Sequence, residues 1–301
     1  GLGVSVDEFT LKMRRAESRN FVYLRRRAKP SEADAILSLG LPGVYGEKEY
    51  HRFYPGGEIA AHVVGFTNID DVGQEGIELS FDDWLSGKPG KKKVLKNLYG
   101  EIVRDIMPVA EAVPGRNLRL SIDQRLQFLA YRELKSAIAQ YEALSGSFVL
   151  LDVQTGEVLA MANQPSYNPN NRIQLDLSSV RNRAVTDVFE PGSTVKPFTV
   201  AVALESGLDM GYTIDTSPGF LKVDDAVIKD PRNRGTLDLG GILAYSSQVG
   251  ISRLALSLNE YDIWKQFQTL GFGEVLGVGF PGESSGFLPN RRRWKDIERV
   301  T

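Results

Sequence analysis

The sequence predicts a mixed fold of helices and strands, either α/β or α+β, in which a smaller β-rich domain precedes a larger one. Three observations support this. Residues 123–141 repeat apolar side chains at helical spacing. Residues 148–161 then form two apolar runs joined by a Thr-Gly turn, which is typical of a hairpin. Residues 44–104, by contrast, are short β-prone pieces broken by glycine and proline.

The first domain is expected to contain short elements. A helix is predicted from Ser31, a candidate N-cap, through Leu39. The Gly-Lys-Pro-Gly segment at 87–90 predicts a turn, and the lysines at 91–93 predict a solvated loop or hairpin tip. Residues 108–116 end in a Pro-Gly-Arg sequence and predict a linker. We therefore expect one domain over residues 1–116 and a second over residues 117–301.

The second domain is expected to begin with a strand, because Leu118 and Leu120 alternate with polar residues. After the helix at 123–141, the continuous apolar runs of the hairpin predict a sheet that helices cover. Two more helices are predicted, from Ser193 to Gly207 and from Ile242 to Leu258. A glycine-rich irregular loop is expected over 271–289.

Composition excludes several classes of function. The chain has 301 residues, 42% of them hydrophobic, and a net charge of −2, which gives no electrostatic case for binding nucleic acid. It has no cysteine and only two histidines, so disulfides, thiolate metal sites and three-histidine sites are excluded, and we expect no metal or cofactor. No apolar run reaches the roughly 18 residues of a membrane span. The chain begins with Gly1, so we interpret it as an excised or processed piece.

Residues 190–197 carry the strongest chemical signal. Pro-Gly breaks the preceding structure and delivers Ser193 to a helix N-terminus, with Lys196 three residues later on the same face. A serine hydroxyl needs an adjacent base to act as a nucleophile. Lys196 could be that base, because burial and the positive end of the helix dipole both lower the pKa of an ammonium group. The alternative is that Ser193 is a plain N-cap and Lys196 a surface residue.

A second polar segment lies downstream. Ser246 could relay a proton, and Gln248 could bind a substrate carbonyl; alternatively, this segment is only a helix N-cap.

At this point the sequence resembles a known family, the class B penicillin-binding proteins, which are peptidoglycan D,D-transpeptidases with an acylated serine. Residues 190–197 resemble the family's Ser-x-x-Lys motif, and residues 246–250 resemble its Ser-x-Asn motif. Residues 152–161 resemble the hairpin of the transpeptidase core, and residues 164–170 and 181–184 resemble the loop before the nucleophile. Residues 52–65 and 73–78 resemble the membrane-proximal pedestal module. Within the pedestal, Arg52 and Glu78 are predicted to pair.

The resemblance implies an α+β fold: a β-rich, dimerisation-type pedestal, followed by the N-terminal part of a transpeptidase domain with helices on an antiparallel sheet. It implies Ser193, Lys196 and Ser246 as catalytic residues and Ser247 and Gln248 as substrate-binding residues. It implies that stem peptides ending in D-Ala-D-Ala are the substrates and that β-lactams acylate Ser193. Among subfamilies the chain looks most like the septal transpeptidase of Gram-negative bacteria. That implies the periplasmic face of the inner membrane, an anchor outside this chain, and division-machinery partners including a lipid II glycosyltransferase.

The sequence departs from the family pattern at two points. Gln248 stands where the motif has asparagine, and no Lys-Thr/Ser-Gly tripeptide occurs, which we interpret as a C-terminal truncation. Two alternatives therefore stay open. One is a β-lactam hydrolase or sensor of the same superfamily, against which the pedestal resemblance argues. The other is a catalytically incompetent fragment or scaffold that docks cell-division partners through residues 1–116.

Overall fold

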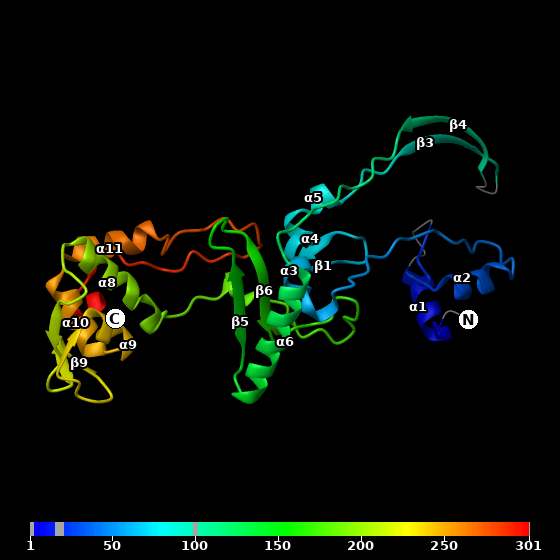
Figure 1. Cartoon of the computed structure of the whole chain (residues 1–301). Helices are drawn as coiled ribbons and strands as arrows, with labels where there is room; N and C mark the ends of the chain where they lie inside the picture. The colour runs from blue at the N-terminus through cyan, green and yellow to red at the C-terminus, as the bar shows by residue number, and fades with distance from the viewer. Residues whose placement is uncertain (1–2, 16–20, 99–101, 301) are drawn as a thin grey trace. The chain divides into compact units, whose positions relative to one another are not determined.

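The computed structural model describes residues 3–15, 21–98 and 102–300. The chain divides into two units by its internal contacts, and Figure 1 labels many of their helices and strands. Unit 1 comprises Gly1–Leu120 together with Ser166–Asp176, and unit 2 comprises Ser121–Pro165 together with Leu177–Thr301. The fold is α+β, as the resemblance implied, because helices accompany antiparallel strand pairs in both units.

Unit 1 consists of short elements, which include helices where the sequence indicated mainly strands. In order they are α1 (Val6–Arg15), α2 (Pro30–Leu37), η1 (Gly57–Ile59), α3 (Ala61–Val64), β1 (Phe66–Thr67), β2 (Gly73–Glu75), α4 (Gly76–Ser80), α5 (Asp82–Leu85), β3 (Lys91–Lys96) and β4 (Ile102–Ala110). The predicted helix from Ser31 is therefore present as α2. Glycine and proline in this region separate short helices as well as short strands, so these residues alone did not distinguish the two.

The backbone packs very closely where β1 meets β2 in unit 1. Gly65 has a φ of 77°, and a Cβ atom there would lie 1.7 Å from the carbonyl oxygen of Glu75. Only glycine allows both the left-handed conformation and this approach. The segment Ser166–Asp176 also packs in this unit: Tyr167 is buried, and its hydroxyl donates to the carbonyl oxygen of Ala61 at 3.0 Å.

The predicted loop at lysines 91–93 is wrong, because these residues begin strand β3, which pairs antiparallel with β4. A two-stranded ribbon leaves side chains on both faces in water, so a lysine run can join a strand without burying charge. Strand β4 includes Pro108, which is paired with Lys92 beside a register shift of the ladder, and such irregular positions are where strands accommodate proline. The predicted strand at Leu118 and Leu120 is also wrong: this stretch joins none of the sheets in the part of the chain that is described.

Unit 2 begins with the predicted helix and hairpin. Helix α6 (Gln124–Gln140) follows its N-cap Asp123, whose carboxylate accepts from two backbone N–H groups, and it packs on the antiparallel pair β5 (Gly146–Leu151) and β6 (Val158–Gln164). Their shared core is small and alanine-rich, which lets the helix approach the strands closely. Its members are Ala130, Ala160 and Ala162, with Leu126, Tyr131, Leu134 and Leu150 packed against them.

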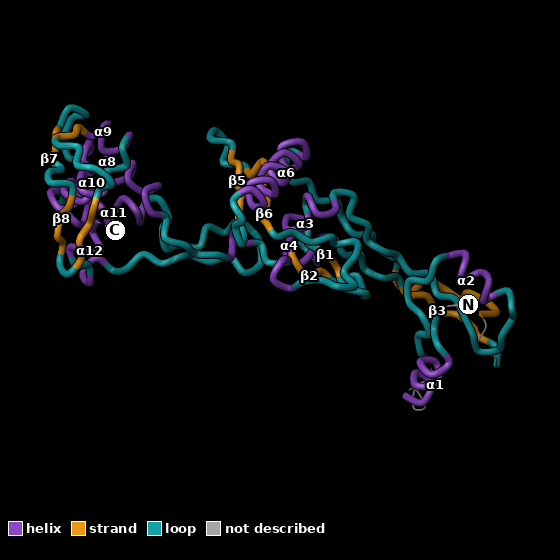
Figure 2. Tube along the Cα trace, turned by 90° about the horizontal axis from the view of Figure 1, so that it is seen from below, coloured by secondary structure: helices purple, strands orange, loops and turns teal. Residues whose placement is uncertain are grey.

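The remainder of unit 2 is a helical cluster edged by short strand pairs (Figure 2). Before it come η2 (Leu177–Ser179) and α7 (Arg183–Thr186), of which α7 packs on β5 and β6. The elements of the cluster are η3 (Gly192–Val195), α8 (Lys196–Glu205), β7 (Thr213–Asp215), β8 (Phe220–Val223), β9 (Ala226–Lys229), β10 (Thr236–Asp238), α9 (Leu239–Ala244), α10 (Gln248–Ser257), α11 (Glu260–Thr269), η4 (Arg291–Arg293) and α12 (Asp296–Val300). Helices α8, α9, α10 and α11 share one apolar core that includes the fully buried Leu239, Ile242 and Leu254. Residues 271–289 form the expected irregular loop. No helix among the described residues is both long and apolar enough to cross a bilayer.

Candidate active site

Ser193 lies on a tight turn that leads into helix α8. Gly192 has a φ of 59°, a conformation that glycine adopts readily, and it opens the 3₁₀ turn η3 that contains Ser193. The α-helix itself begins at Lys196, and Pro197 occupies its first turn, where proline removes no helical hydrogen bond. The predicted helix from Ser193 therefore starts as a 3₁₀ turn, and Ser193 precedes the α-helical part.

Lys196 is buried at the start of α8, with 8% of its surface exposed. Its Nζ atom donates to the carbonyl oxygen of Ser246 at 2.7 Å and to the Ser246 hydroxyl at 3.0 Å. The Ser246 hydroxyl in turn donates to the Ser193 hydroxyl at 3.0 Å. The three side chains predicted to be catalytic thus form one hydrogen-bonded chain, in which Ser246 bridges the lysine and the candidate nucleophile.

Ser246 reaches this position because the helix predicted from Ile242 to Leu258 is broken. Helix α9 ends at Ala244 and α10 begins at Gln248, so the single predicted helix is wrong. Ser246 lies in the gap with a φ of 49°, a conformation that costs energy for any residue except glycine. Because Ser246 lies outside both helices, its side chain can form hydrogen bonds with both Lys196 and Ser193.

The two predicted substrate-binding residues have different surroundings. Ser247 is buried and its hydroxyl accepts from the backbone N–H of Gly250 at 2.9 Å, so it is the N-cap of α10. Gln248 is exposed at the first position of α10. The structure therefore brings Gln248 to the surface beside Ser246, whereas the Ser247 hydroxyl is used within the fold.

Asp230 also belongs to this site, and the sequence analysis did not identify it. Its carboxylate accepts from the Ser247 hydroxyl at 2.6 Å and from the backbone N–H groups of Gln248 and Val249 at 2.6 and 3.1 Å. These residues are 17 to 19 positions apart in sequence. No local spacing pattern could have indicated the contact.

The surroundings of Lys196 prepare it to lose its proton. Burial lowers the pKa of its ammonium group, and the negative charge of Asp230 opposes that shift without cancelling it. The positive end of the α8 dipole is expected to act in the same direction as burial. A buried lysine with a lowered pKa, bonded through one hydroxyl to a serine on a tight turn, is suited to activating that serine.

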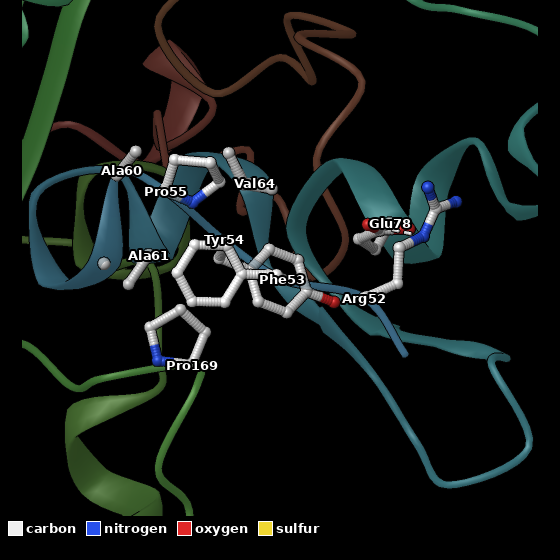
Figure 3. Close-up of a pocket in the computed structure, with 11 residues that line it drawn as sticks. Arg52, Phe53, Tyr54, Pro55, Ala60, Ala61, Val64, Glu78 and Pro169 are labelled. Atoms are coloured by element: carbon white, nitrogen blue, oxygen red, sulfur yellow. Dashed lines mark ion pairs between the residues drawn. The ribbon is translucent and has the colours of Figure 1, made fainter. Parts of the chain in front are cut away.

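A separate pocket of about 190 Å³ lies within unit 1 and has no comparable chemistry. Figure 3 shows Arg52 reaching Glu78 at one side of it and Tyr54, Pro55 and Pro169 at the other. Arg52 Nε and Glu78 Oε1 are 3.3 Å apart, which confirms the predicted pair. Burial raises the pKa of Glu78, and Arg52 opposes this shift.

Comparisons with known proteins agree with the resemblance that the motifs indicated. Residues 146–301 match a family model described as the penicillin-binding protein transpeptidase domain, and residues 2–120 match one described as the penicillin-binding protein dimerisation domain. The chain is 45% identical, over 301 residues, to the peptidoglycan D,D-transpeptidase FtsI of Escherichia coli K12; this covers 100% of the chain and 51% of that protein. It is 44% identical over 281 residues to the probable peptidoglycan D,D-transpeptidase PbpC of Pseudomonas aeruginosa, covering 93% of the chain and 50% of that protein.

Among solved structures, penicillin-binding protein 3 of Mycobacterium tuberculosis matches with a TM-score of 0.72 and 31% identity, over 83% of this chain and 53% of that one. The transpeptidase domain of Burkholderia pseudomallei penicillin-binding protein 3 matches with a TM-score of 0.54 and 37% identity, over 62% of this chain and 53% of that one. The chain spans about half the length of the curated relatives that it matches.

Proposed function

The chain belongs to the penicillin-binding protein transpeptidase family, and from that premise we propose that it is a D,D-transpeptidase that cross-links peptidoglycan stem peptides through an acylated Ser193. The observation that carries the proposal is the hydrogen-bonded chain from Lys196 through Ser246 to Ser193. It supplies a nucleophile, a bridge for its proton and a base whose pKa is lowered. If Ser193 were only an N-cap and Lys196 a surface residue, the lysine would be exposed and would not be linked to Ser193 through a hydroxyl.

In the proposed acylation, Ser193 Oγ attacks the carbonyl carbon of the penultimate D-Ala of a stem peptide. Its proton passes through the Ser246 hydroxyl to Lys196 Nζ, which must first be neutral. The bond from that carbonyl carbon to the nitrogen of the terminal D-Ala then breaks, and the proton returns through Ser246 to the leaving amine. The backbone N–H of Ser193 would contribute to binding the oxyanion. The products are free D-Ala and an ester on Ser193.

In the second half-reaction, an amine of a neighbouring stem peptide attacks the ester carbonyl and gives up a proton along the same chain. The bond from Ser193 Oγ to the acyl carbon breaks, Ser193 regains its proton, and a new peptide bond joins the two stems. Gln248, exposed next to Ser246, would bind the substrate carbonyl. Ser193, Ser246 and Lys196 therefore account for the protons that move in both steps.

Intact-mass spectrometry after incubation with benzylpenicillin tests the proposal. Opening the β-lactam ring breaks its amide bond but releases no leaving group, so the chain should gain the whole mass of the antibiotic. Ser193→Ala should gain none. Absence of an adduct both in this chain and in a chain extended through a Lys-Thr/Ser-Gly strand would overturn the enzyme proposal in favour of a scaffold. An adduct that forms and is then lost quickly would indicate a β-lactam hydrolase instead.

The biological setting is part of the same proposal. We propose a role in septal cell-wall synthesis at the periplasmic face of the inner membrane, which the motif resemblance implies; a relative named a peptidoglycan D,D-transpeptidase supports the joining of stem peptides. Membrane proteins of the division machinery, including a lipid II glycosyltransferase, are the proposed partners. Depletion of the protein in its host, scored by filamentation without septa, tests this setting: normal division would contradict it.

A further inference from the structure

Asp230 links a hairpin of unit 2 to the turn that carries Ser246. It directly follows strand β9, and its backbone N–H donates to the carbonyl oxygen of Gly219 at 2.9 Å, which ties it to the other side of the hairpin β8–β9. Its carboxylate then accepts the three bonds described above, all from residues 247–249. A side chain anchored on a hairpin thus fixes the start of helix α10.

The turn between α9 and α10 needs such support, because Ser246 is in an unfavourable backbone conformation. On one side the turn is held to α9, since the backbone N–H of Ser247 donates to the carbonyl oxygen of Ile242 at 2.9 Å. On the other side the bonds come from Asp230. We propose that Asp230 is a positioning residue of the acylation site, which holds the turn at residues 246–249 so that Ser246 lies between Lys196 and Ser193. This inference rests on the proposed function.

The type of residue matters as well as its bonds. A carboxylate can accept several hydrogen bonds at once and is stabilised at the N-terminus of a helix, here the ten-residue α10. An asparagine of similar size can accept through only one oxygen and carries no charge. Substitution of aspartate by asparagine therefore separates the charge of Asp230 from its shape.

The charge has a defined effect on Lys196. Lys196 Nζ donates to the Ser246 hydroxyl and carbonyl, which are neutral, and the negative charge of Asp230 also acts on the lysine. A negative charge favours the ammonium form, so Asp230 raises the pKa of Lys196 against the larger lowering by burial. Removal of the charge should lower that pKa further, and the rise of the acylation rate with pH should shift to lower pH.

The test compares Asp230→Asn, Asp230→Glu and a matched control in the full chain. Asp225 suits the control, because it is an exposed aspartate in the turn of the same hairpin. The readout is the rate of benzylpenicillin acylation as a function of pH. Asp230→Asn should react about tenfold more slowly at its plateau, because Ser246 is less well placed. Its pH profile should also shift to lower pH.

Asp230→Glu should keep the profile at the wild-type pH while losing part of the rate, and Asp225→Asn should change neither. A purely structural role for Asp230 would lower the rate without moving the profile. An unshifted profile in Asp230→Asn would therefore overturn the proposal, as would an equal shift in Asp225→Asn. The melting temperature of each variant is compared with that of the wild-type chain, so that a loss of rate caused by misfolding is recognised.

A second readout separates this proposal from the proposed function. The pKa of Lys196 is measured by NMR titration of ¹³C-labelled lysine, with Lys196→Arg to assign the signal. Asp230→Asn should lower that pKa, and Asp230→Glu should not. If the wild-type chain forms no adduct, the proposed function fails by its own test. The lysine titration is independent of that result. A lower pKa of Lys196 in Asp230→Asn supports the proposal for Asp230, and an unchanged pKa overturns it.

Discussion

Lys196 can act as a base only after it has lost its proton, so its environment sets the pH dependence of acylation. Burial, the larger influence, lowers the pKa of its ammonium group, and Asp230 raises it. The acylation rate should therefore rise with pH along a limb centred below the ordinary pKa of lysine. The rate of adduct formation, followed by mass from acid to alkaline pH, checks this. A limb at the ordinary lysine value would show that Lys196 is solvated in the reacting state.

Gln248 tests whether an amide in this position binds substrate. Its side chain is exposed at the first residue of α10 and does not belong to the chain of Lys196, Ser246 and Ser193. Gln248→Ala should slow acylation about tenfold to hundredfold, because one donor to the reacting carbonyl is lost. The pH profile should stay in place, since the base is untouched. Gln248→Asn, which keeps an amide, serves as the control, and an unchanged rate in Gln248→Ala would contradict the role.

At the scale of residues, the sequence indicated candidate residues through local motifs. Ser193 and Lys196 lie within one turn, which allows a nucleophile and a base, but that spacing alone left open a plain N-cap and a surface lysine, and the family resemblance favoured the catalytic interpretation. The positive φ of Ser246 and the contact of Asp230 with residues 247–249 depend on how separate segments pack. No periodicity or motif carries that information. The sequence therefore indicated Ser246 as a candidate but not the helix break that positions it.

The Arg52–Glu78 pair joins a loop to helix α4 in unit 1. The Glu78 side chain is 7% exposed and the Arg52 side chain 42% exposed, so the carboxylate is the buried partner. Arg52→Ala should lower the free energy of unfolding of unit 1 by about 1 to 2 kcal/mol at neutral pH, because the carboxylate loses its cation. Urea unfolding followed by hydrogen exchange in α4 measures this.

The sign of the pH effect follows from the raised pKa of Glu78. In the folded state this group takes up its proton at higher pH than in the unfolded state, so its ionised form costs stability above that pKa. The penalty of Arg52→Ala should therefore shrink as pH falls through the folded pKa of Glu78. Glu78→Gln in the Arg52→Ala background removes the charge and is the control. A penalty independent of pH would mean that Arg52 acts through packing alone.

At the scale of elements, prediction succeeded where a strong local pattern covered a whole element. Helix α6 and the hairpin β5–β6 follow the apolar pattern of residues 123–164. Strand β6 is largely buried, but Phe148, Val149 and Leu151 of β5 are exposed, so the prediction that helices cover both faces of this sheet is wrong for β5. The helix expected over 242–258 also has continuous apolar spacing, but it is divided because α9 and α10 pack at a turn held from elsewhere. The lysine run at 91–93 joins a strand only because β4 supplies a partner.

At the scale of the whole chain, unit 1 is discontinuous. The segment Ser166–Asp176 lies beyond the first two strands of unit 2 in sequence but packs in unit 1. Several of its side chains bond there: Asn170 exchanges two hydrogen bonds of 2.9 Å with the backbone of Tyr54, and Arg172 donates to the carbonyl oxygen of Thr67 at 2.8 Å. The sequence indicates a loop at residues 164–170 by its resemblance to the loop before the nucleophile, and a loop sequence does not indicate on which unit it packs.

Tyr167 is a buried aromatic side chain of this returning segment. It is 5% exposed, and its ring meets the rings of His62 and Phe66 edge-on at centroid distances of 5.4 and 5.8 Å. Tyr167→Ala should lower the free energy of unfolding of unit 1 by about 3 kcal/mol, since it removes a buried aromatic side chain. Hydrogen exchange should accordingly speed up in peptides that cover residues 54–67, a hundred residues away in sequence.

Tyr167→Phe is the matched control for this substitution. It keeps the ring and removes only the hydroxyl bond to Ala61, so its cost should be about 1 kcal/mol. If Tyr167→Ala instead accelerated exchange only in α6, β5 and β6, the segment would belong energetically to unit 2. The expected pattern would mean that the two family regions of the chain are interleaved, because residues 166–176 lie inside the region that matches the transpeptidase model. A cut of the chain at residue 120 would then leave unit 1 without the side chain that closes its core.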